Sequence, residues 1–144
     1  ELRCVATHGL QECPYVTLVR FDGPLFFANA SYLEDTITEI IRSKEGLNHI
    51  LVVANGINDI DSSGEETLSL LVDRVRSNGI DISMSGVNES VLEVFDRTHF
   101  LAKIGEDHLF PTLEKAIIGI HESAHAQNQE ADCPLLTACR LVEA

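Results

Sequence analysis

An uninterrupted apolar run with an amphipathic helical pattern on each side is the feature that most constrains how this chain folds. The run covers residues 50–54 (I-L-V-V-A). It contains no alternating polar residue, which is typical of a strand covered on both faces of a sheet. Helical spacing places on one face Leu33, Ile37, Ile40 and Ile41 before the run, and Leu68, Leu71, Val72 and Val75 after it. This helix–strand–helix order predicts an α/β fold with mostly parallel strands.

The segment before the first helix predicts a hairpin. Residues 15–22 (Y-V-T-L-V-R-F-D) are rich in β-branched and aromatic residues, and the Gly-Pro pair that follows them favours a turn. Residues 25–28 (L-F-F-A) then predict a second short strand. The first helix is expected to begin at Ser31, whose spacing from Glu34 fits a capping box.

The later part of the chain predicts one more strand and two more helices. Residues 80–87 alternate apolar and polar side chains, as a strand does, and Asn88 is placed to cap a helix. Residues 100–104 fit a short strand or an extended connection, and Pro111 suits the first turn of the last helix. The sequence therefore predicts an α/β fold: a small mixed β-sheet of about 4-5 strands flanked by about 4 helices.

Composition limits the class of partner. The chain of 144 residues carries 10 Lys and Arg against 23 Asp and Glu, a formal net charge of -13. Such a charge disfavours a nucleic-acid backbone or an anionic membrane surface as a partner. No run approaches the ~18 apolar residues of a membrane span. Because the chain begins with Glu1 and its single Met is Met84, we expect it to be a piece of a longer protein.

One domain is expected over residues 14–122, with 1–13 as a linker or lead-in and 123–144 as a polar tail, either disordered or docked on the domain. The four cysteines are Cys4, Cys13, Cys133 and Cys139. Their spacing fits no common zinc pattern. Free thiols in a reducing compartment are the first interpretation, and a disulfide between the two ends of the chain is the alternative.

The loop after the apolar run is the candidate functional site. Its polar residues are Asn58, Asp59, Asp61, Ser62 and Ser63, followed by Gly64. Loops at the carboxyl ends of parallel strands bind ligands in open α/β sheets. Two interpretations of these serines stay open. Either they belong to a ligand-binding or regulated site, or they cap the following helix, because Ser62 and Ser63 stand at capping-box spacing from Glu65 and Glu66. A nucleotide could bind the positive end of the following helix, although the surrounding carboxylates oppose it; calorimetry with ATP or GTP would decide.

Two segments together resemble a known family. The string D-S-S-G at residues 61–64 and the string G-P-L-F-F-A-N at residues 23–29 are similar to the signatures of STAS domains. The second string most resembles the cytoplasmic carboxyl-terminal STAS domain of SulP (sulfate permease) anion transporters. The family positions fall on Gly23, Pro24, Phe26, Phe27, Ala28 and Asn29, for which we expect a mainly structural role.

The resemblance implies a regulatory or structural domain of a transporter for sulfate or another anion. It implies a place on the cytoplasmic face of the bacterial inner membrane, as part of an integral membrane protein. The implied partners are the transmembrane portion of the same transporter, a regulatory protein, and a second copy through a dimer of the parent protein. No catalytic residue, metal or cofactor is expected. The alternative is a free-standing anti-sigma-factor antagonist that is switched by phosphorylation of Ser62.

An enzyme is the remaining alternative. Residues His121, Glu122 and His125 formally match the H-E-x-x-H pattern of zinc proteases. The match lies at the end of the last predicted helix and runs into the polar tail, with no third ligand in evidence. We therefore expect no metalloprotease; a metal that survives dialysis and is lost in His121→Ala would revive this hypothesis.

Overall fold

A five-stranded mixed sheet forms the centre of the molecule. The computed structural model describes residues 2–4, 15–44 and 46–124. The strands are β1 (Leu2–Cys4), β2 (Val16–Asp22), β3 (His49–Gly56), β4 (Asp81–Ser85) and β5 (Leu109–Phe110), in the spatial order β1-β2-β3-β4-β5. Strand β1 is antiparallel to β2, and the remaining neighbours are parallel. Strand β1 comes from the segment that was expected to be a linker or lead-in.

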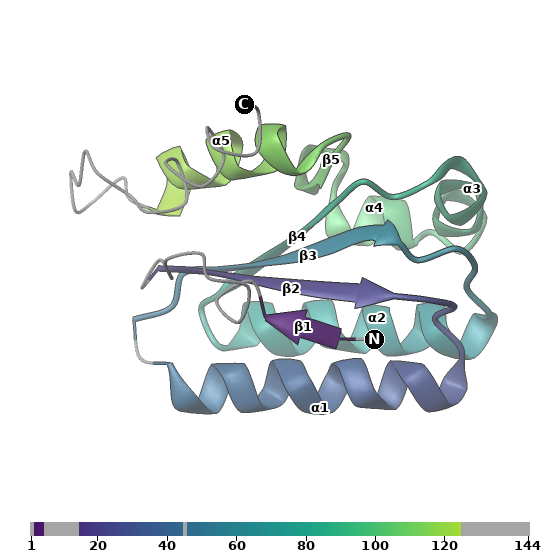
Figure 1. Cartoon of the computed structure of the whole chain (residues 1–144), viewed down its shortest axis with the longest axis horizontal. Helices are drawn as coiled ribbons and strands as arrows, with labels where there is room; N and C mark the ends of the chain where they lie inside the picture. Colours follow the sequence, from purple (N-terminus) through teal and green to yellow (C-terminus); the bar gives the residue numbers. More distant parts are fainter. Residues whose placement is uncertain (1, 5–14, 45, 125–144) are drawn as a thin grey trace.

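Helices cover both faces of this sheet (Figure 1). Helices α1 (Phe27–Ser43) and α2 (Ser62–Ser77) lie side by side on one face, and α5 (Leu113–Ala124) lies on the other. Helices α3 (Glu89–Arg97) and α4 (Phe100–Ile104) and the short 3-10 helix η2 (Glu106–His108) fill the connection between β4 and β5. The predicted α/β fold with a mixed sheet is confirmed.

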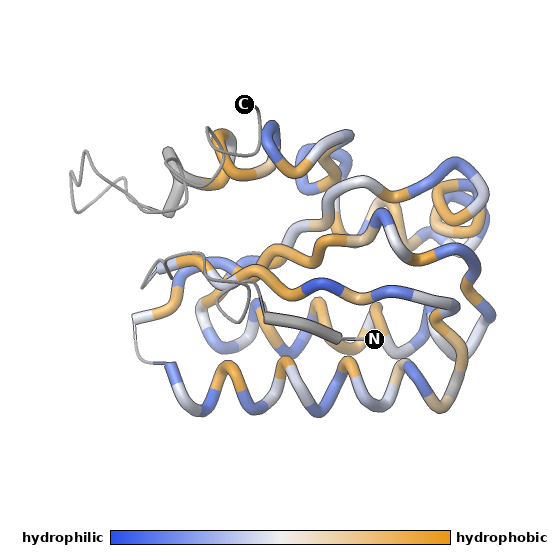
Figure 2. Tube along the Cα trace, in the orientation of Figure 1, coloured by the Kyte–Doolittle hydropathy of each residue, from blue (hydrophilic) through white to orange (hydrophobic). Residues whose placement is uncertain are grey.

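Burial of β3 on both faces is confirmed as well. Ile50 and Val52 belong to the larger apolar cluster, against α1 and α2, while Leu51 and Val53 belong to the smaller one, against α5. Figure 2 shows the corresponding pattern, with hydrophobic colour along β3 and alternating colour along α1. The apolar stripe of α1 is thereby turned toward the sheet.

The hairpin predicted for residues 15–28 is wrong. Both edges of β2 are occupied, by β1 and by β3, so no edge remains for a strand at 25–28. Leu25 instead forms an isolated parallel bridge with Ile60. Helix α1 begins at Phe27, four residues before the predicted Ser31, because the Ala30 amide already donates to the Phe26 carbonyl at 2.8 Å and the buried face of the helix includes Ala30. Ser31 lies inside the helix and is exposed.

Two predictions in the second half of the chain also need correction. Residues 100–104 form helix α4 rather than a strand, because Phe100 and Ile104, one helical turn apart, are both buried. The last helix begins at Leu113, so Pro111 precedes it, and the Thr112 hydroxyl accepts a hydrogen bond from the Lys115 amide at 3.2 Å. The predicted capping by Asn88 is confirmed.

A polar network joins the amino ends of β3 and β4 to η2. Nε2 of the buried His49 lies 2.8 Å from Oγ of Ser83, and the ring of His49 stacks on the ring of His108 with 6.5 Å between centroids. Nε2 of His108 lies 2.6 Å from Oδ2 of Asp81. Arg76 donates to the other oxygen of Asp81 and to two carbonyls at the end of α4. The network thus binds α2, α4 and η2 to the sheet.

This network predicts a loss of stability in acid. Burial lowers the pKa of His49 from 6.5 to about 4. Burial alone would raise the pKa of the Asp81 carboxyl, but hydrogen bonds from His108 and the Ile82 amide outweigh it, and that pKa is lowered too. Unfolding therefore takes up a proton at His49 between pH 6.5 and 4. We expect the free energy of unfolding to fall through this window, by at most about 3 kcal/mol from His49.

Urea denaturation at a series of pH values measures this effect. In His49→Asn the stability should be lower at neutral pH and should change less between pH 6.5 and 4, because the buried imidazole is gone. His99→Asn is the matched control, since His99 is exposed and Asn tolerates its left-handed backbone (φ 67°). A His49→Asn profile parallel to that of the parent chain would show that this imidazole is not the cause.

Candidate functional site

Three loops meet at the carboxyl ends of β2, β3 and β4, and hydrogen bonds join them into one surface, here called the loop cluster (residues 22–26, 55–64 and 86–88). The Gly23 amide donates to the Gly56 carbonyl at 2.8 Å, and the Leu25 amide donates to the Asp59 carbonyl at 2.9 Å. The Asn88 side chain donates to a third carbonyl, that of Ile57, at 2.7 Å. The shape of the cluster is therefore set mainly by backbone atoms.

Glycines allow the three loops to approach this closely. A Cβ atom on Gly64 would overlap the Leu25 carbonyl oxygen, and one on Gly56 would overlap the Asp22 carboxylate. Gly86 adopts a positive φ of 70°, and a Cβ there would lie 2.8 Å from Cβ of Asn55. Gly64, which meets a backbone carbonyl, and Gly86, with its positive φ, are thus strongly restricted to glycine, whereas at Gly56 the Asp22 side chain would have to move.

Asp61 caps helix α2, which the sequence did not predict. Oδ1 of Asp61 accepts a hydrogen bond from the Gly64 amide at 2.7 Å, so the capping role expected of Ser62 and Ser63 is wrong. Asp and Ser are about equally favoured at this position, and capping by Asp61 places both serines inside the first turn. Ser62 is exposed, and its hydroxyl has no hydrogen-bond partner among the residues that the structure describes.

The structure brings the two family-like segments together. The Leu25–Ile60 bridge ties residues 23–29 to the loop before α2. The Asn29 side chain donates to the Pro24 carbonyl at 2.8 Å, which fixes the start of α1 beside the cluster. Phe26 is the exposed apolar residue here, with 40% of its surface accessible. Ala28 is exposed at the first turn of α1, and Phe27 is the first residue of that helix.

The charge of the loop cluster is negative. Asp59 is exposed, Asp61 and Asp22 are half-buried, and Glu65 adds a carboxylate in the first turn of α2. Nε of Arg20 lies 3.1 Å from Oδ1 of Asp22, where it offsets one of these charges. Carboxylates around the amino end of α2 oppose a phosphate more than the helix dipole favours it. Nucleotide binding therefore stays a prediction.

The candidate metal and thiol sites are largely beyond what the structure describes. The backbone of His121 and Glu122 belongs to α5, while His125, Cys13, Cys133 and Cys139 lie outside the described residues. Among the residues whose side chains the structure describes, which do not include those of His121 and Glu122, no three His, Cys, Asp or Glu groups converge closely enough to hold a metal ion. The metalloprotease alternative gains nothing from these residues.

Sequence reasoning missed the contacts that connect the loops. Gly56 and Gly86 each end or follow a strand, which is a weak signal for a close approach of backbones. The second role of Asn88, as a donor to the loop after β3, spans 31 positions in the chain. Such a contact leaves no local pattern in the sequence. The capping role of Asn88 was therefore predictable, and its hydrogen bond to the loop after β3 was not.

Comparison with known proteins identifies the relatives of this chain. The model of the STAS domain family matches residues 9–116. The chain is 30% identical over 101 residues to the probable sulfate transporter 3.5 of Arabidopsis thaliana, covering 69% of this chain and 16% of that protein. It is 26% identical over 100 residues to the putative sulfate transporter YvdB of Bacillus subtilis, covering 69% and 18%. The chain thus spans less than a fifth of the length of these relatives.

Solved structures share the fold. The STAS domain of a SulP transporter from Vibrio cholerae superposes with a TM-score of 0.67 at 23% identity, covering 85% of this chain and 94% of that one. The anti-sigma factor antagonist SpoIIAA in its unphosphorylated form gives a TM-score of 0.66 at 15% identity, covering 84% and 96%. In the described part of the chain, none of the helices has the length and apolarity that crossing a membrane requires.

Replacement of Gly64 tests the geometry of the loop cluster. In Gly64→Ala the new methyl group must displace the Leu25 carbonyl, so we expect the free energy of unfolding to fall by roughly 1–3 kcal/mol. Urea denaturation measures the loss. Ser62→Ala, two residues away at an exposed position, is the matched control and should stay within about 0.5 kcal/mol of the parent. Equal effects of the two variants would contradict the close contact.

Proposed function

This chain belongs to the STAS domain family, and from that premise we propose that it is the cytoplasmic regulatory and structural domain of a SulP-type transporter of sulfate or another anion. The observation that carries the proposal is the loop cluster, a preformed surface that offers groups for contact but no assembled catalytic residues. Its partners would be the transmembrane portion of the same transporter, a regulatory protein, and a second copy through a dimer of the parent. Its place would be the cytoplasmic face of the bacterial inner membrane.

The relatives support this proposal by their names and their size. Five of the relatives that this chain matches are named as sulfate transporters, among them the two described above, and the chain covers only 16% to 20% of their length. The remainder of such a protein is large enough to hold a transport path. This domain would then act on transport from outside that path, and the choice of anion would lie elsewhere in the protein.

The loop cluster could influence transport by binding one state of the membrane portion better than another. A domain shifts such an equilibrium only by the difference between its two binding energies. A surface built from cross-loop backbone hydrogen bonds changes little on binding, so contact costs little ordering entropy. Phe26 supplies an exposed apolar anchor, and Asn58, Asp59 and Ser62 are exposed polar residues of another loop of the cluster. Folding and assembly of the parent protein would depend on the same contacts.

The first test uses the native source. Membranes are fractionated and blotted with an antibody against this domain. We expect a band several times heavier than the 15.8 kDa of this chain, which carbonate does not extract. A soluble band of about the size of a lone domain would contradict the transporter proposal.

A second test places variants in the full-length parent. Phe26→Ser should lower sulfate uptake per transporter in the membrane, because it removes the apolar anchor of the loop cluster. Tyr32→Ser is the matched control, since Tyr32 is a more exposed aromatic residue (58% against 40%) farther along α1. Equal uptake by Phe26→Ser and Tyr32→Ser would show that the Phe26 side chain of the loop cluster does not influence transport.

The second candidate function is a free-standing anti-sigma-factor antagonist. The observation that favours it is the exposed hydroxyl of Ser62 at the first residue of α2, which forms no hydrogen bond with the described residues. A phosphate there would meet the favourable helix dipole but also the carboxylates of Asp59, Asp61 and Glu65. Its effect would therefore be to repel a partner from the loop cluster.

Incubation with the cognate kinase and labelled ATP tests this switch. We expect Ser62→Ala to abolish labelling, whereas Ser63→Ala, which removes the neighbouring hydroxyl, should still be labelled. Labelling of Ser62→Ala at the level of the parent chain would exclude Ser62 as the site. The result is independent of the membrane fractionation, so both candidate functions can be judged separately.

A further inference from the structure

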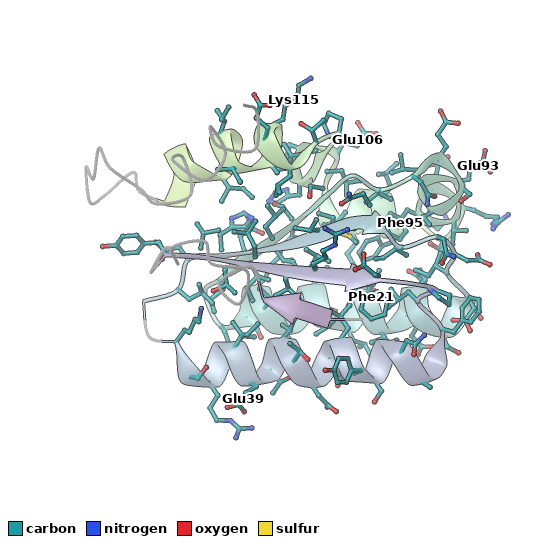
Figure 3. All side chains as sticks on the ribbon, in the orientation of Figure 1. Phe21, Glu39, Glu93, Phe95, Glu106 and Lys115 are labelled. Atoms are coloured by element: carbon teal, nitrogen blue, oxygen red, sulfur yellow. The ribbon has the colours of Figure 1, made fainter. Side chains whose placement is uncertain are left out.

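A groove with an apolar floor and an acidic rim lies between α3, α4, η2 and β5. Its volume is about 720 Å³, and none of its lining residues belongs to the loop cluster. The floor is formed by Leu92, Leu101 and Leu109, and the rim by Glu89, Glu93, Asp96 and Glu106. Figure 3 labels one rim residue on each side, Glu93 on α3 and Glu106 at the start of η2.

Helix α3 has two distinct faces, one packed in the core and one along the groove. Val91 and Phe95 are buried, and Phe95 packs against Phe100 with ring centroids 4.6 Å apart. The second stripe, at helical spacing i, i+3, i+4 and i+7, consists of Glu89, Leu92, Glu93 and Asp96, all of which line the groove. The three leucines of the floor are half-buried: they rest on the core from one side and face the groove from the other.

No ion pair with the described residues neutralises the rim charges. Glu89, Glu93, Asp96 and Glu106 are all exposed, and none forms an ion pair with the residues that the structure describes. Lys103 of α4 is turned away from the groove: its Nζ lies 2.7 Å from Asp73 and 2.7 Å from Ser69, both on α2. The groove therefore keeps four negative charges around an apolar floor.

The spacing of these charges indicates the kind of ligand. The carboxylates do not converge on one point, because no metal-binding group of three is present among the described residues. Their charge repels an anionic small molecule or lipid head group. Along α3, Glu89 and Asp96 are separated by about two helical turns, roughly 10 Å. We propose that the groove binds a basic amphipathic helix of a protein partner, with its large apolar side chains on the three leucines and its Lys or Arg side chains on the rim.

A peptide titration of the full 144-residue chain tests this proposal. The probe is a peptide of about four turns with Leu on one face and Lys on the other. Two matched peptides carry Ala in place of Leu, or Glu in place of Lys. Binding is followed by NMR chemical shifts, with the leucine methyl groups assigned. We expect the Lys/Leu peptide to shift Leu92, Leu101 and Leu109 first, and the other two peptides to bind at least about fivefold more weakly.

Charge-reversal variants separate the groove from the overall charge of -13. Glu93→Lys with Glu106→Lys should raise the Kd of the Lys/Leu peptide roughly tenfold. Asp35→Lys with Glu39→Lys, on α1, changes the net charge equally and should leave the Kd nearly unchanged. Equal weakening by the two double variants, shifts centred elsewhere, or tight binding of the Glu/Leu peptide would each overturn the proposal. None of these results depends on the proposed transporter function.

Discussion

Burial of β3 on both faces is the constraint on which the rest of the structure depends. A strand buried in this way needs a partner strand along each edge for its backbone hydrogen bonds, and helices above and below it to cover its side chains. Strands β2 and β4 fill the edges in parallel, so the chain must cross over between them, and α1 and α2 are those crossovers. Parallel pairing also gathers the carboxyl ends of three strands at one side of the sheet. The loop cluster exists because of that arrangement.

The sequence was most informative where one local period persisted. The run at 50–54 and the stripes of α1 and α2 predicted their elements and the fold class. Prediction was wrong at residues 25–28, where an apolar tetrapeptide fits a strand or a helix, and the choice was made by β1 occupying the edge of β2. Residues 100–104 were ambiguous for the same reason. Short apolar segments take their conformation from tertiary context, which a single local window does not contain.

The sequence likewise predicted only part of the candidate site. Its position, after β3 and before α2, followed from the order of elements, and both family-like strings pointed to it. Its internal construction did not follow, because Gly64 against Leu25 and Asn88 against Ile57 are contacts between distant segments. The capping residue was misassigned by one position, and that single position decides whether the Ser62 hydroxyl is occupied or exposed. A shift of one position in the capping residue therefore changes which side-chain groups of the loop are exposed.

The backbone construction of the loop cluster separates its shape from its specificity. The hydrogen bonds between loops run mostly from amide to carbonyl, so they are insensitive to most side-chain replacements. The exposed side chains of Phe26, Asn58 and Ser62 lie on this backbone scaffold and take no part in its hydrogen bonds. One scaffold can thus present different recognition surfaces while its fold remains constant. Changes of partner would then require only a few surface substitutions, whereas the glycines beneath them admit almost none.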